Sequence, residues 1–317
     1  MNRVLVIKLG ALGDVVLAFA AMRRIREAHP EATITLLTTP PYAPLGEACP
    51  YVNAVESDGR PDGPLGTARL IARLRGARYD RVYDLQTNSR SSAYFQLLRP
   101  RPPEWSGVAA GCSHPHRNPD RDHMHTLERQ AQQLGDAGIW PDAPTEPGQA
   151  PPPDLGWLAR PEAAAAFGLG ARYVLLVPGG SAHRPEKRWP VDGYAELARL
   201  LGDQGVSVGV IGGPAEAKLA ERITQAAPRA IDLTGRTDFA QIAALGAGAL
   251  LAVGNDTGPT HLLAASGAPT LALFSSASDP ALCAPRGRAA AFLRAKSLAD
   301  LPLDAVLGRA AALTATG

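Results

Sequence analysis

The 317-residue sequence has few cysteines, no long apolar run and no excess of charge of one sign. Its three cysteines lie far apart, and no C-x-x-C pair occurs. This argues against a disulfide framework and favours free thiols in a reducing compartment. The net charge is +2, from 32 basic and 30 acidic residues spread over both halves. A protein dedicated to binding nucleic acid is therefore not indicated.

The sequence also lacks 18 consecutive apolar residues, so no membrane-spanning helix is predicted. The N-terminal stretch superficially resembles a secretory signal peptide. However, Lys8 and Asp14 interrupt its apolar run, and no clean cleavage site follows it. We therefore expect a cytoplasmic protein, with peripheral contact to the cytoplasmic face of an inner membrane left open.

Short apolar runs alternate with amphipathic segments along the chain. Strands are predicted at 3–8, 33–38, 81–85, 173–177, 206–211, 231–233, 250–253 and 270–274. Amphipathic helical segments are predicted at 13–28, 65–75, 124–138, 191–201, 215–227, 239–246, 259–266 and 298–312. This alternation predicts an α/β protein with two doubly wound, Rossmann-like domains built on parallel sheets.

The segment 146–156 is rich in proline and glycine and has no apolar periodicity, so it is the best candidate for a linker. It divides the chain into predicted domains of 1–150 and 151–317. Ligands of doubly wound sheets bind at the carboxyl ends of strands, near helix N-termini. The residues that directly follow the predicted strands are therefore the candidates for a site.

The first such position is the stretch KLGALGD at 8–14. Its G-x-x-G spacing is neither the G-x-G-x-x-G of dinucleotide sites nor a P-loop, which argues against NAD binding and ATP hydrolysis. Asp14 falls in the first turn of the predicted helix. Two interpretations stay open: an acid that complements the helix dipole, or a general base directed at a substrate.

The second position is VPGGSAHRPEKRWP at 177–190. Gly179, Gly180 and Ser181 can offer backbone N–H groups and a hydroxyl to a phosphate. Lys187, one of only four lysines in the chain, adds a cation. A phosphate-binding loop is the favoured interpretation, and a solvated basic loop is the alternative.

The third position is GNDTGPTHLLAASG at 254–267. Asp256 and Thr257 can cap the helix that follows, and a helix start with a nearby glycine is also an anion site. His261 lies one turn into that helix. Capping explains Asp256 alone, whereas a binding site explains the whole cluster.

Four of the seven histidines fall between residues 114 and 125. Two H-x-H pairs could ligate a metal, but their spacing fits no standard zinc pattern, and the intervening residues suggest a flexible loop. We therefore predict no metal site in the His114–His125 region.

Together these motifs resemble glycosyltransferase family 9, the ADP-heptose:lipopolysaccharide heptosyltransferases and their relatives. The matching segments are VLVIKLGALGDVV, YDLQTNSRSS, PGGSAHRPEKRWP and GNDTGPTHLLAASGAPTLALFSSASDP, and they occur in the family's order. The resemblance implies a GT-B fold, in which an N-terminal acceptor domain and a C-terminal nucleotide-sugar domain face a central cleft. It also implies that the helix at 298–312 crosses back to the first domain.

Residue by residue, the resemblance makes Asp14 the general base and Lys187 the cation at the departing diphosphate. It implies a set of residues that bind the ADP-sugar: Gly180, Ser181, Lys187, Glu216, Asp256, Thr257, Gly258 and His261. Within that set, Glu216 would lie at the ribose and Asp256 at the transferred sugar. Four residues would line the acceptor side: Asp84, Gln86, Asn88 and Arg90.

No D-x-D-like metal-binding pair is evident, so Lys187 and a helix N-terminus are expected to stabilise the leaving group. The prediction is an inverting, metal-independent transfer of a heptose or related sugar from an ADP-sugar to a lipid-linked inner-core saccharide. The ADP-sugar would be a co-substrate, and no cofactor is expected. Two alternatives stay open: a nucleotide-sugar epimerase, and a non-catalytic nucleotide-sugar-binding module on the same scaffold.

Overall fold

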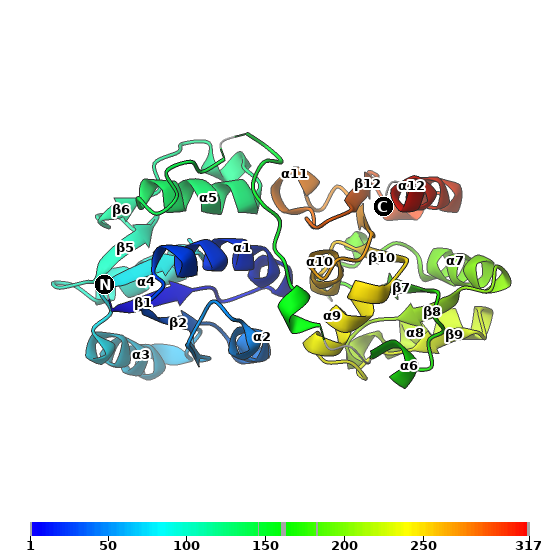
Figure 1. Cartoon of the computed structure of the whole chain (residues 1–317), viewed down its shortest axis with the longest axis horizontal. Helices are drawn as coiled ribbons and strands as arrows, with labels where there is room; N and C mark the ends of the chain where they lie inside the picture. The colour runs from blue at the N-terminus through cyan, green and yellow to red at the C-terminus, as the bar shows by residue number, and fades with distance from the viewer. Residues whose placement is uncertain (1, 145, 160–162, 182, 316–317) are drawn as a thin grey trace. The chain divides into compact units, whose positions relative to one another are not determined.

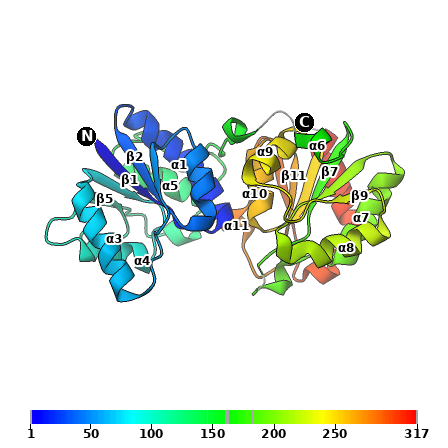
Figure 2. The same cartoon turned by 90° about the horizontal axis from the view of Figure 1, so that it is seen from below.

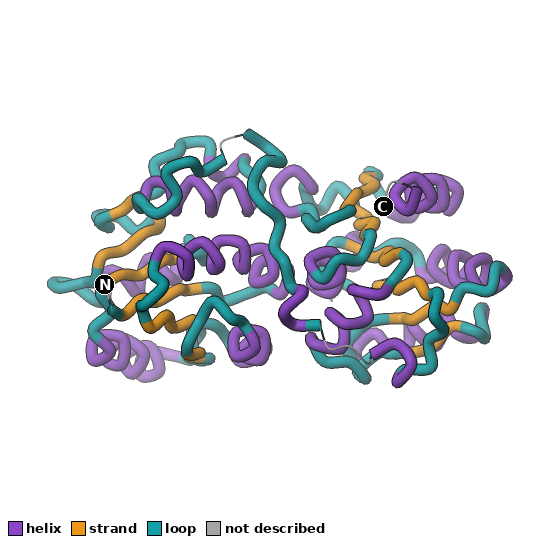
Figure 3. The backbone as a smooth tube through the Cα atoms, viewed as in Figure 1, coloured by secondary structure: helices purple, strands orange, loops and turns teal. Residues whose placement is uncertain are grey.

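The computed structural model describes residues 2–144, 146–159, 163–181 and 183–315. The chain forms two compact units, Met1–Pro151 and Pro152–Gly317. The predicted division lay at residues 150 and 151, inside the proline-rich segment. In each unit a layer of strands lies between layers of helices (Figure 3).

The first unit is built on a parallel sheet with the strand order β3-β2-β1-β4-β5-β6. Its strands are β1 (Arg3–Ile7), β2 (Thr33–Leu37), β3 (Ala54–Glu56), β4 (Arg81–Asp84), β5 (Glu104–Gly107) and β6 (His114–Pro115). Its helices are α1 (Leu12–Ala28), α2 (Ala43–Ala48), α3 (Gly63–Ala77), α4 (Ser89–Leu97) and α5 (Thr126–Asp136). Strand β1 is central, and four of its five residues are buried, as in a strand covered on both faces.

Helices cover both faces of this sheet (Figure 1). Leu17 of α1 and Leu127 of α5 pack together on one face. On the other face, Leu70 and Leu74 of α3 pack with Phe95 of α4. Figure 2, seen from below, shows α3 and α4 beside one another on that face.

The second unit repeats the plan with the strand order β12-β11-β10-β7-β8-β9, again all parallel. Its strands are β7 (Tyr173–Val177), β8 (Ser207–Val210), β9 (Ala230–Asp232), β10 (Leu251–Asn255), β11 (Thr270–Phe274) and β12 (Ala290–Arg294). Its helices are α6 (Ala163–Ala166), α7 (Val191–Asp203), α8 (Ala217–Ala226), α9 (Phe239–Gly248), α10 (Gly258–Ala265), α11 (Pro280–Cys283) and α12 (Leu303–Ala315). The predicted α/β class and the doubly wound, Rossmann-like sheets are confirmed.

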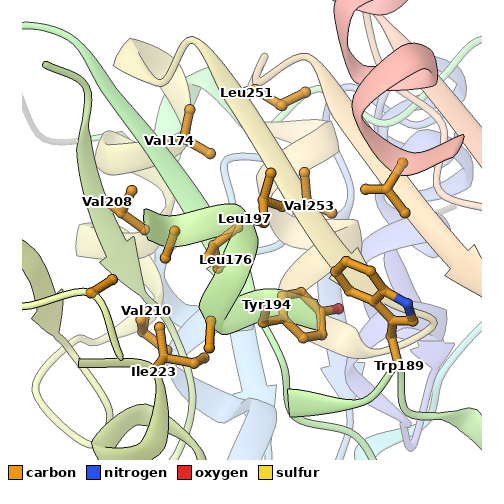
Figure 4. Close-up of a cluster of buried hydrophobic side chains, with 14 of the residues drawn as sticks. Val174, Leu176, Trp189, Tyr194, Leu197, Val208, Val210, Ile223, Leu251 and Val253 are labelled. Carbon is orange, nitrogen blue, oxygen red and sulfur yellow. The ribbon is translucent and has the colours of Figure 1, made fainter. Parts of the chain in front are cut away.

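The segment between β7 and α7, which carries Lys187, is called the basic loop. The core of the second unit extends to the C-terminal end of this loop. Trp189 is buried in it and meets Tyr194 edge to face, with ring centroids 4.9 Å apart (Figure 4). The Trp189 Nε1 donates to the carbonyl of Leu301, 3.0 Å away. The loop that carries Lys187 is therefore fixed at its C-terminal end by burial of an aromatic ring.

The C-terminal segment differs from the single helix predicted at 298–312. A short 3-10 helix at Leu298–Asp300 is followed by Pro302 and then by α12. Val306 and Ala310 of α12 are buried in the core of the second unit. The crossing of this helix to the first domain stays a prediction.

The histidine-rich segment also differs from the expected loop, because it contains the edge strand β6 and a 3-10 helix at Arg121–His123.

In the part of the chain that the structure describes, no helix is both long and apolar enough to cross a membrane.

Candidate active site

Asp14 lies at the start of α1, at the carboxyl end of β1. Its Oδ2 accepts a hydrogen bond from the backbone N–H of Ala11 at 3.1 Å, and the side chain is partly exposed. One carboxylate oxygen of Asp14 therefore has the role expected of a residue at the start of a helix. The same bond fixes the orientation of the carboxylate, which a general base also requires.

Lys8, the last residue before this turn, is only 4% exposed, and sequence reasoning missed it. Its Nζ donates to the carbonyl of Leu85 at 3.3 Å. Burial lowers the pKa of Lys8, and the nearby carboxylates of Asp14 and Asp84 oppose that shift. The signal in the sequence was a lysine at the end of an apolar strand, where a charge is costly unless it is compensated.

The predicted acceptor residues lie at the end of β4 and directly after it, and β4 pairs with β1. Gln86 accepts a hydrogen bond from the backbone N–H of Leu9 at 2.7 Å. The structure therefore brings the loop after β4 against the loop after β1. Asn88 caps α4 by accepting from Ser91 N at 3.0 Å, and Arg90 is exposed.

Asp84 is placed differently from a residue that lines a binding surface, because its side chain is fully buried. Its Oδ1 accepts from the backbone N–H groups of Gln86 and Thr87, at 3.1 and 2.9 Å. Burial raises the pKa of Asp84 to about 6, although these hydrogen bonds and Lys8 favour the charged form. Asp84 therefore orders the turn that presents the other three residues.

In the second unit, Lys187 and Asp256 form an ion pair. Lys187 Nζ lies 2.7 Å from Asp256 Oδ2, and the two side chains are 14% and 8% exposed. His261 Nε2 lies 3.7 Å from the other carboxylate oxygen. Burial alone would raise the pKa of Asp256, but its interactions with His261 and Lys187 outweigh burial and hold that pKa well below its usual range. Asp256 is thus a carboxylate between two basic groups.

The start of α10 lies beside this pair. Thr257 occupies the N-cap position in an extended conformation, and no hydrogen bond from its side chain caps the helix. Gly258 is the first residue of the helix, so the first backbone N–H groups are not covered by a side chain there. The capping predicted for Thr257 is not observed, and the helix start keeps its capacity to bind an anion.

The loops after β7 and β8 meet at Gly179. A side chain on Gly179 would come within 2.6 Å of Glu216 Cγ, so only glycine allows this approach. Glu216 Oε2 accepts from the backbone N–H of Gly213 at 2.9 Å. Gly180 and the exposed Ser181 follow directly. Glu216 is thereby placed next to the predicted phosphate loop, and its role at the ribose stays a prediction.

Asn255, which sequence reasoning missed, connects these parts. It is fully buried at the end of β10. Its Nδ2 donates to the carbonyls of Pro178 and Gly179, at 2.9 and 3.0 Å. Its Oδ1 accepts from Trp189 N at 2.9 Å and from the Tyr194 hydroxyl at 3.0 Å. One amide therefore holds both ends of the basic loop against β10.

The histidines predicted not to form a metal site have separate structural partners. His114 Nδ1 lies 3.0 Å from Ser113 Oγ, and His125 Nδ1 accepts from the backbone N–H of Leu127 at 3.2 Å. Across the described ranges, no group of three or more His, Cys, Asp or Glu side chains is arranged to hold a metal ion.

Both sheets place these residues at the same topological position. In each unit the strand order reverses between the first and fourth strands, and ligands of doubly wound sheets bind outside the carboxyl ends at such a point. Asp14 and Gln86 follow β1 and β4, whereas Gly180 and Asp256 follow β7 and β10.

The chain is similar in sequence and in fold to known heptosyltransferases. The chain is 26% identical over 302 residues to lipopolysaccharide heptosyltransferase 2 of Escherichia coli, covering 87% of this chain and 83% of the relative. It superimposes on the structure of E. coli ADP-heptose lps heptosyltransferase II with a TM-score of 0.80 and 26% identity, over 100% of this chain and 99% of the other. The E. coli heptosyltransferase WaaC with ADP shares the fold at a TM-score of 0.76 and 22% identity, over 97% and 98% of the two chains.

These solved structures confirm the predicted GT-B class of fold for a chain of two Rossmann-like units. The sequence model of glycosyltransferase family 9 (heptosyltransferase) matches residues 67–301, which is most of the chain. The protein is a glycosyltransferase, and it belongs to glycosyltransferase family 9.

Proposed function

We propose that the protein transfers a heptose from ADP-heptose to an inner-core lipopolysaccharide acceptor carried by a lipid. The observation that carries this proposal is the Lys187–Asp256 ion pair beside the uncapped start of α10. It combines a cation and backbone N–H groups, which suit a diphosphate, with a carboxylate, which suits the hydroxyls of a sugar. The names of the relatives, which are lipopolysaccharide heptosyltransferases, support the choice of donor and acceptor.

In the proposed donor site, the diphosphate lies against Lys187, Ser181, Gly180 and the start of α10, where Thr257 and Gly258 offer backbone N–H groups. The leaving diphosphate gains negative charge as the bond to the anomeric carbon breaks. A fixed cation and a helix N-terminus stabilise that charge without reorganising. This supports a transfer that does not require a metal ion.

Asp256 and His261 complete the proposed donor site. The depressed pKa of Asp256 keeps it ionised at neutral pH, so it accepts hydrogen bonds from sugar hydroxyls rather than donating a proton. Glu216 lies one loop away and is proposed to bind the ribose hydroxyls. This arrangement separates recognition of the nucleotide from recognition of the sugar.

In the first unit, Asp14 is proposed to remove the proton from the attacking acceptor hydroxyl. Attack on the face opposite the diphosphate would invert the configuration at the anomeric carbon. Gln86, Asn88 and Arg90 are proposed to bind the acceptor directly, with Asp84 holding their loop in place. We place the protein in the cytoplasm, peripherally at the inner membrane face.

The test is an assay of purified protein with ADP-heptose and a heptose-deficient lipopolysaccharide acceptor. Release of ADP together with a heptosylated acceptor is expected, and the configuration of the new bond is read by NMR. An arm with donor alone tests the epimerase alternative, because an epimerase would change the sugar without an acceptor. A third arm adds EDTA, and undiminished transfer is expected. Loss of transfer that a divalent ion restores would contradict the metal-independent mechanism.

A further inference from the structure

Positive charge is concentrated in one part of the first unit. Residues 60–101 contain nine arginines and three acidic residues, a net charge of +6 in a chain whose total is +2. This segment includes α3 and α4, which cover the same face of the first sheet (Figure 2). The remainder of the chain is therefore net acidic, and the excess of basic charge lies in this segment.

Some of these arginines are neutralised within the unit. Arg73 pairs with Glu56 at 2.9 Å, and Arg81 pairs with Glu104 at 2.6 Å. The other seven are exposed and form no salt bridge with any residue that the structure describes, and four of them lie close together: Arg75, Arg78, Arg99 and Arg101. Their charge is available to a partner outside the chain.

The four arginines surround one hollow of about 800 Å³ at the C-terminal ends of α3 and α4. Arg75 is fixed there, because its Nη2 donates to the carbonyls of Leu97 and Arg99, at 2.5 and 3.2 Å. Arg99 lies over the ring of Phe95. A second hollow of about 850 Å³ continues between the two helices and shares Arg75.

An exposed leucine, Leu97, accompanies the arginines at the end of α4 and is 47% exposed. Leu65, in the first turn of α3 and so at the opposite end of that helix, is 76% exposed. They are two of the four large apolar side chains that are exposed in the described chain. Leu97 also lines the second hollow.

We propose that this face docks on an anionic phospholipid bilayer. The α3–α4 surface is defined as Arg75, Arg78, Leu97, Arg99 and Arg101. The arginines bind lipid phosphates, and Leu97 enters the boundary between headgroups and acyl chains. The choice of a membrane rests on the proposed function, in which a lipid carries the acceptor. An exposed leucine beside arginines that have no acidic partner favours a membrane over a nucleic acid, which offers Leu97 no apolar surface.

The test is sedimentation of the full-length protein with vesicles. Binding is expected to vesicles of phosphatidylcholine and phosphatidylglycerol in equal parts, and not to vesicles of phosphatidylcholine alone. Raising the salt to about 0.5 M should release the protein, because screening shortens the range of the charges to a few ångströms. Equal binding to both vesicles, or to neither, would overturn the proposal.

The arginine variant is Arg78→Gln/Arg101→Gln, which spares Arg75 and its carbonyl contacts. Each arginine near an anionic surface contributes roughly fivefold, so binding should weaken about 25-fold. The matched control is Arg172→Gln/Arg309→Gln, which removes two exposed arginines from the second unit. It should stay within about twofold of the wild type. An equal loss in both pairs would show that only net charge matters, which contradicts a defined surface.

The leucine variant is Leu97→Asn, with Leu250→Asn as its control, since Leu250 is similarly exposed at 39%. Only Leu97→Asn should weaken vesicle binding. Melting temperatures of all variants establish that they are folded. Self-association of the wild type that the arginine pair abolishes would identify a second copy of the chain as the occupant and overturn the proposal.

Transfer to a soluble, deacylated acceptor separates this proposal from the proposed function. The Arg78→Gln/Arg101→Gln variant should keep wild-type turnover with that acceptor while losing vesicle binding. If the wild type binds anionic vesicles but transfers no heptose, membrane docking by the α3–α4 surface is supported and the proposed function is contradicted. If it transfers heptose but does not bind vesicles, only the membrane-docking proposal is contradicted.

Discussion

Asp14 is the single residue on which the proposed chemistry depends most. Asp14→Asn should lower turnover by roughly 10²–10⁴, because asparagine cannot accept the proton of the attacking hydroxyl. Its Oδ1 can still accept the hydrogen bond from Ala11 N that Asp14 accepts now. ADP affinity should be nearly unchanged, since Asp14 belongs to the first unit and the proposed nucleotide residues belong to the second.

Turnover, ADP affinity and melting temperature measured on one preparation decide between the two interpretations of Asp14. Normal turnover with a lowered melting temperature would make Asp14 a helix-start residue only. Asp62→Asn is the matched control, because Asp62 precedes α3 as an exposed N-cap residue whose side chain makes no capping bond.

Lys187 has two roles at the residue scale, and they can be separated. Lys187→Met should reduce turnover on the order of a hundredfold through loss of the cation at the diphosphate. It should also destabilise the fold by about 3 kcal/mol, because the buried Asp256 carboxylate loses its nearest cation and keeps, of its two basic neighbours, only His261, 3.7 Å away.

The double variant Lys187→Met/Asp256→Asn removes that buried charge. Urea unfolding should show stability largely restored, while transfer stays low. Recovery of transfer together with stability would mean that Lys187 acts only as the structural partner of Asp256.

At the scale of the elements, one buried amide holds a whole loop. Asn255→Ala removes four hydrogen bonds and leaves the carbonyls of Pro178 and Gly179 without that partner. A loss of about 3 kcal/mol is expected from unsatisfied buried groups. Urea unfolding measures it, and Asn88→Ala, the loss of one exposed helix cap, should cost only about 1 kcal/mol. Equal losses for the two variants would contradict the role of Asn255.

We expect the turn after β4 to make the stability of the fold depend on pH. The pKa of Asp84 is raised to about 6 in the folded protein, above its ordinary value of 3.8. Its contribution to stability is therefore fully present below about pH 4 and is lost as pH rises through 6. The difference corresponds to as much as about 3 kcal/mol.

Asp84→Asn keeps the oxygen that accepts from Gln86 and Thr87 but does not ionise. Denaturation at a series of pH values should show that the fall in stability between pH 4 and 6 is absent in this variant. If the variant follows the wild-type pH profile, a group other than Asp84 causes the dependence.

Apolar runs made some elements predictable. Strands β7 and β11 match their predictions because all five residues of each are buried and, apart from Thr270 at the start of β11, they form apolar runs. Strand β12 was missed because only part of each of its side chains is buried, and β6 has only two residues. Helix α4 begins with the polar run Ser89–Ser92, whose helical role depends on its cap at Asn88.

The site could be predicted as a set of loops but not as a set of contacts. Parallel strands bring their carboxyl ends to one edge, so the grouping of Lys187, Asp256 and Glu216 follows from the order of strands and helices. The ion pair, the burial of Asp84 and the bonds of Asn255 depend on side-chain packing that no periodicity encodes.

At the scale of the whole molecule, each unit has its own core and its own sheet. ADP should therefore raise the melting temperature through the second unit, by mass action on its native state. Calorimetry with and without ADP measures this. Where two transitions are resolved, only the one assigned to the second unit should move. A melting temperature that does not change with ADP but rises with NAD would contradict the proposed donor.

The bond from Trp189 to the Leu301 carbonyl links the basic loop to the segment that leads into α12. Trp189 is therefore a built-in optical reporter. Its emission is sensitive both to the packing of the C-terminal segment and to any movement of the loop that carries Lys187. A chain in which the other three tryptophans are replaced by phenylalanine would let loop motion be followed in real time during turnover.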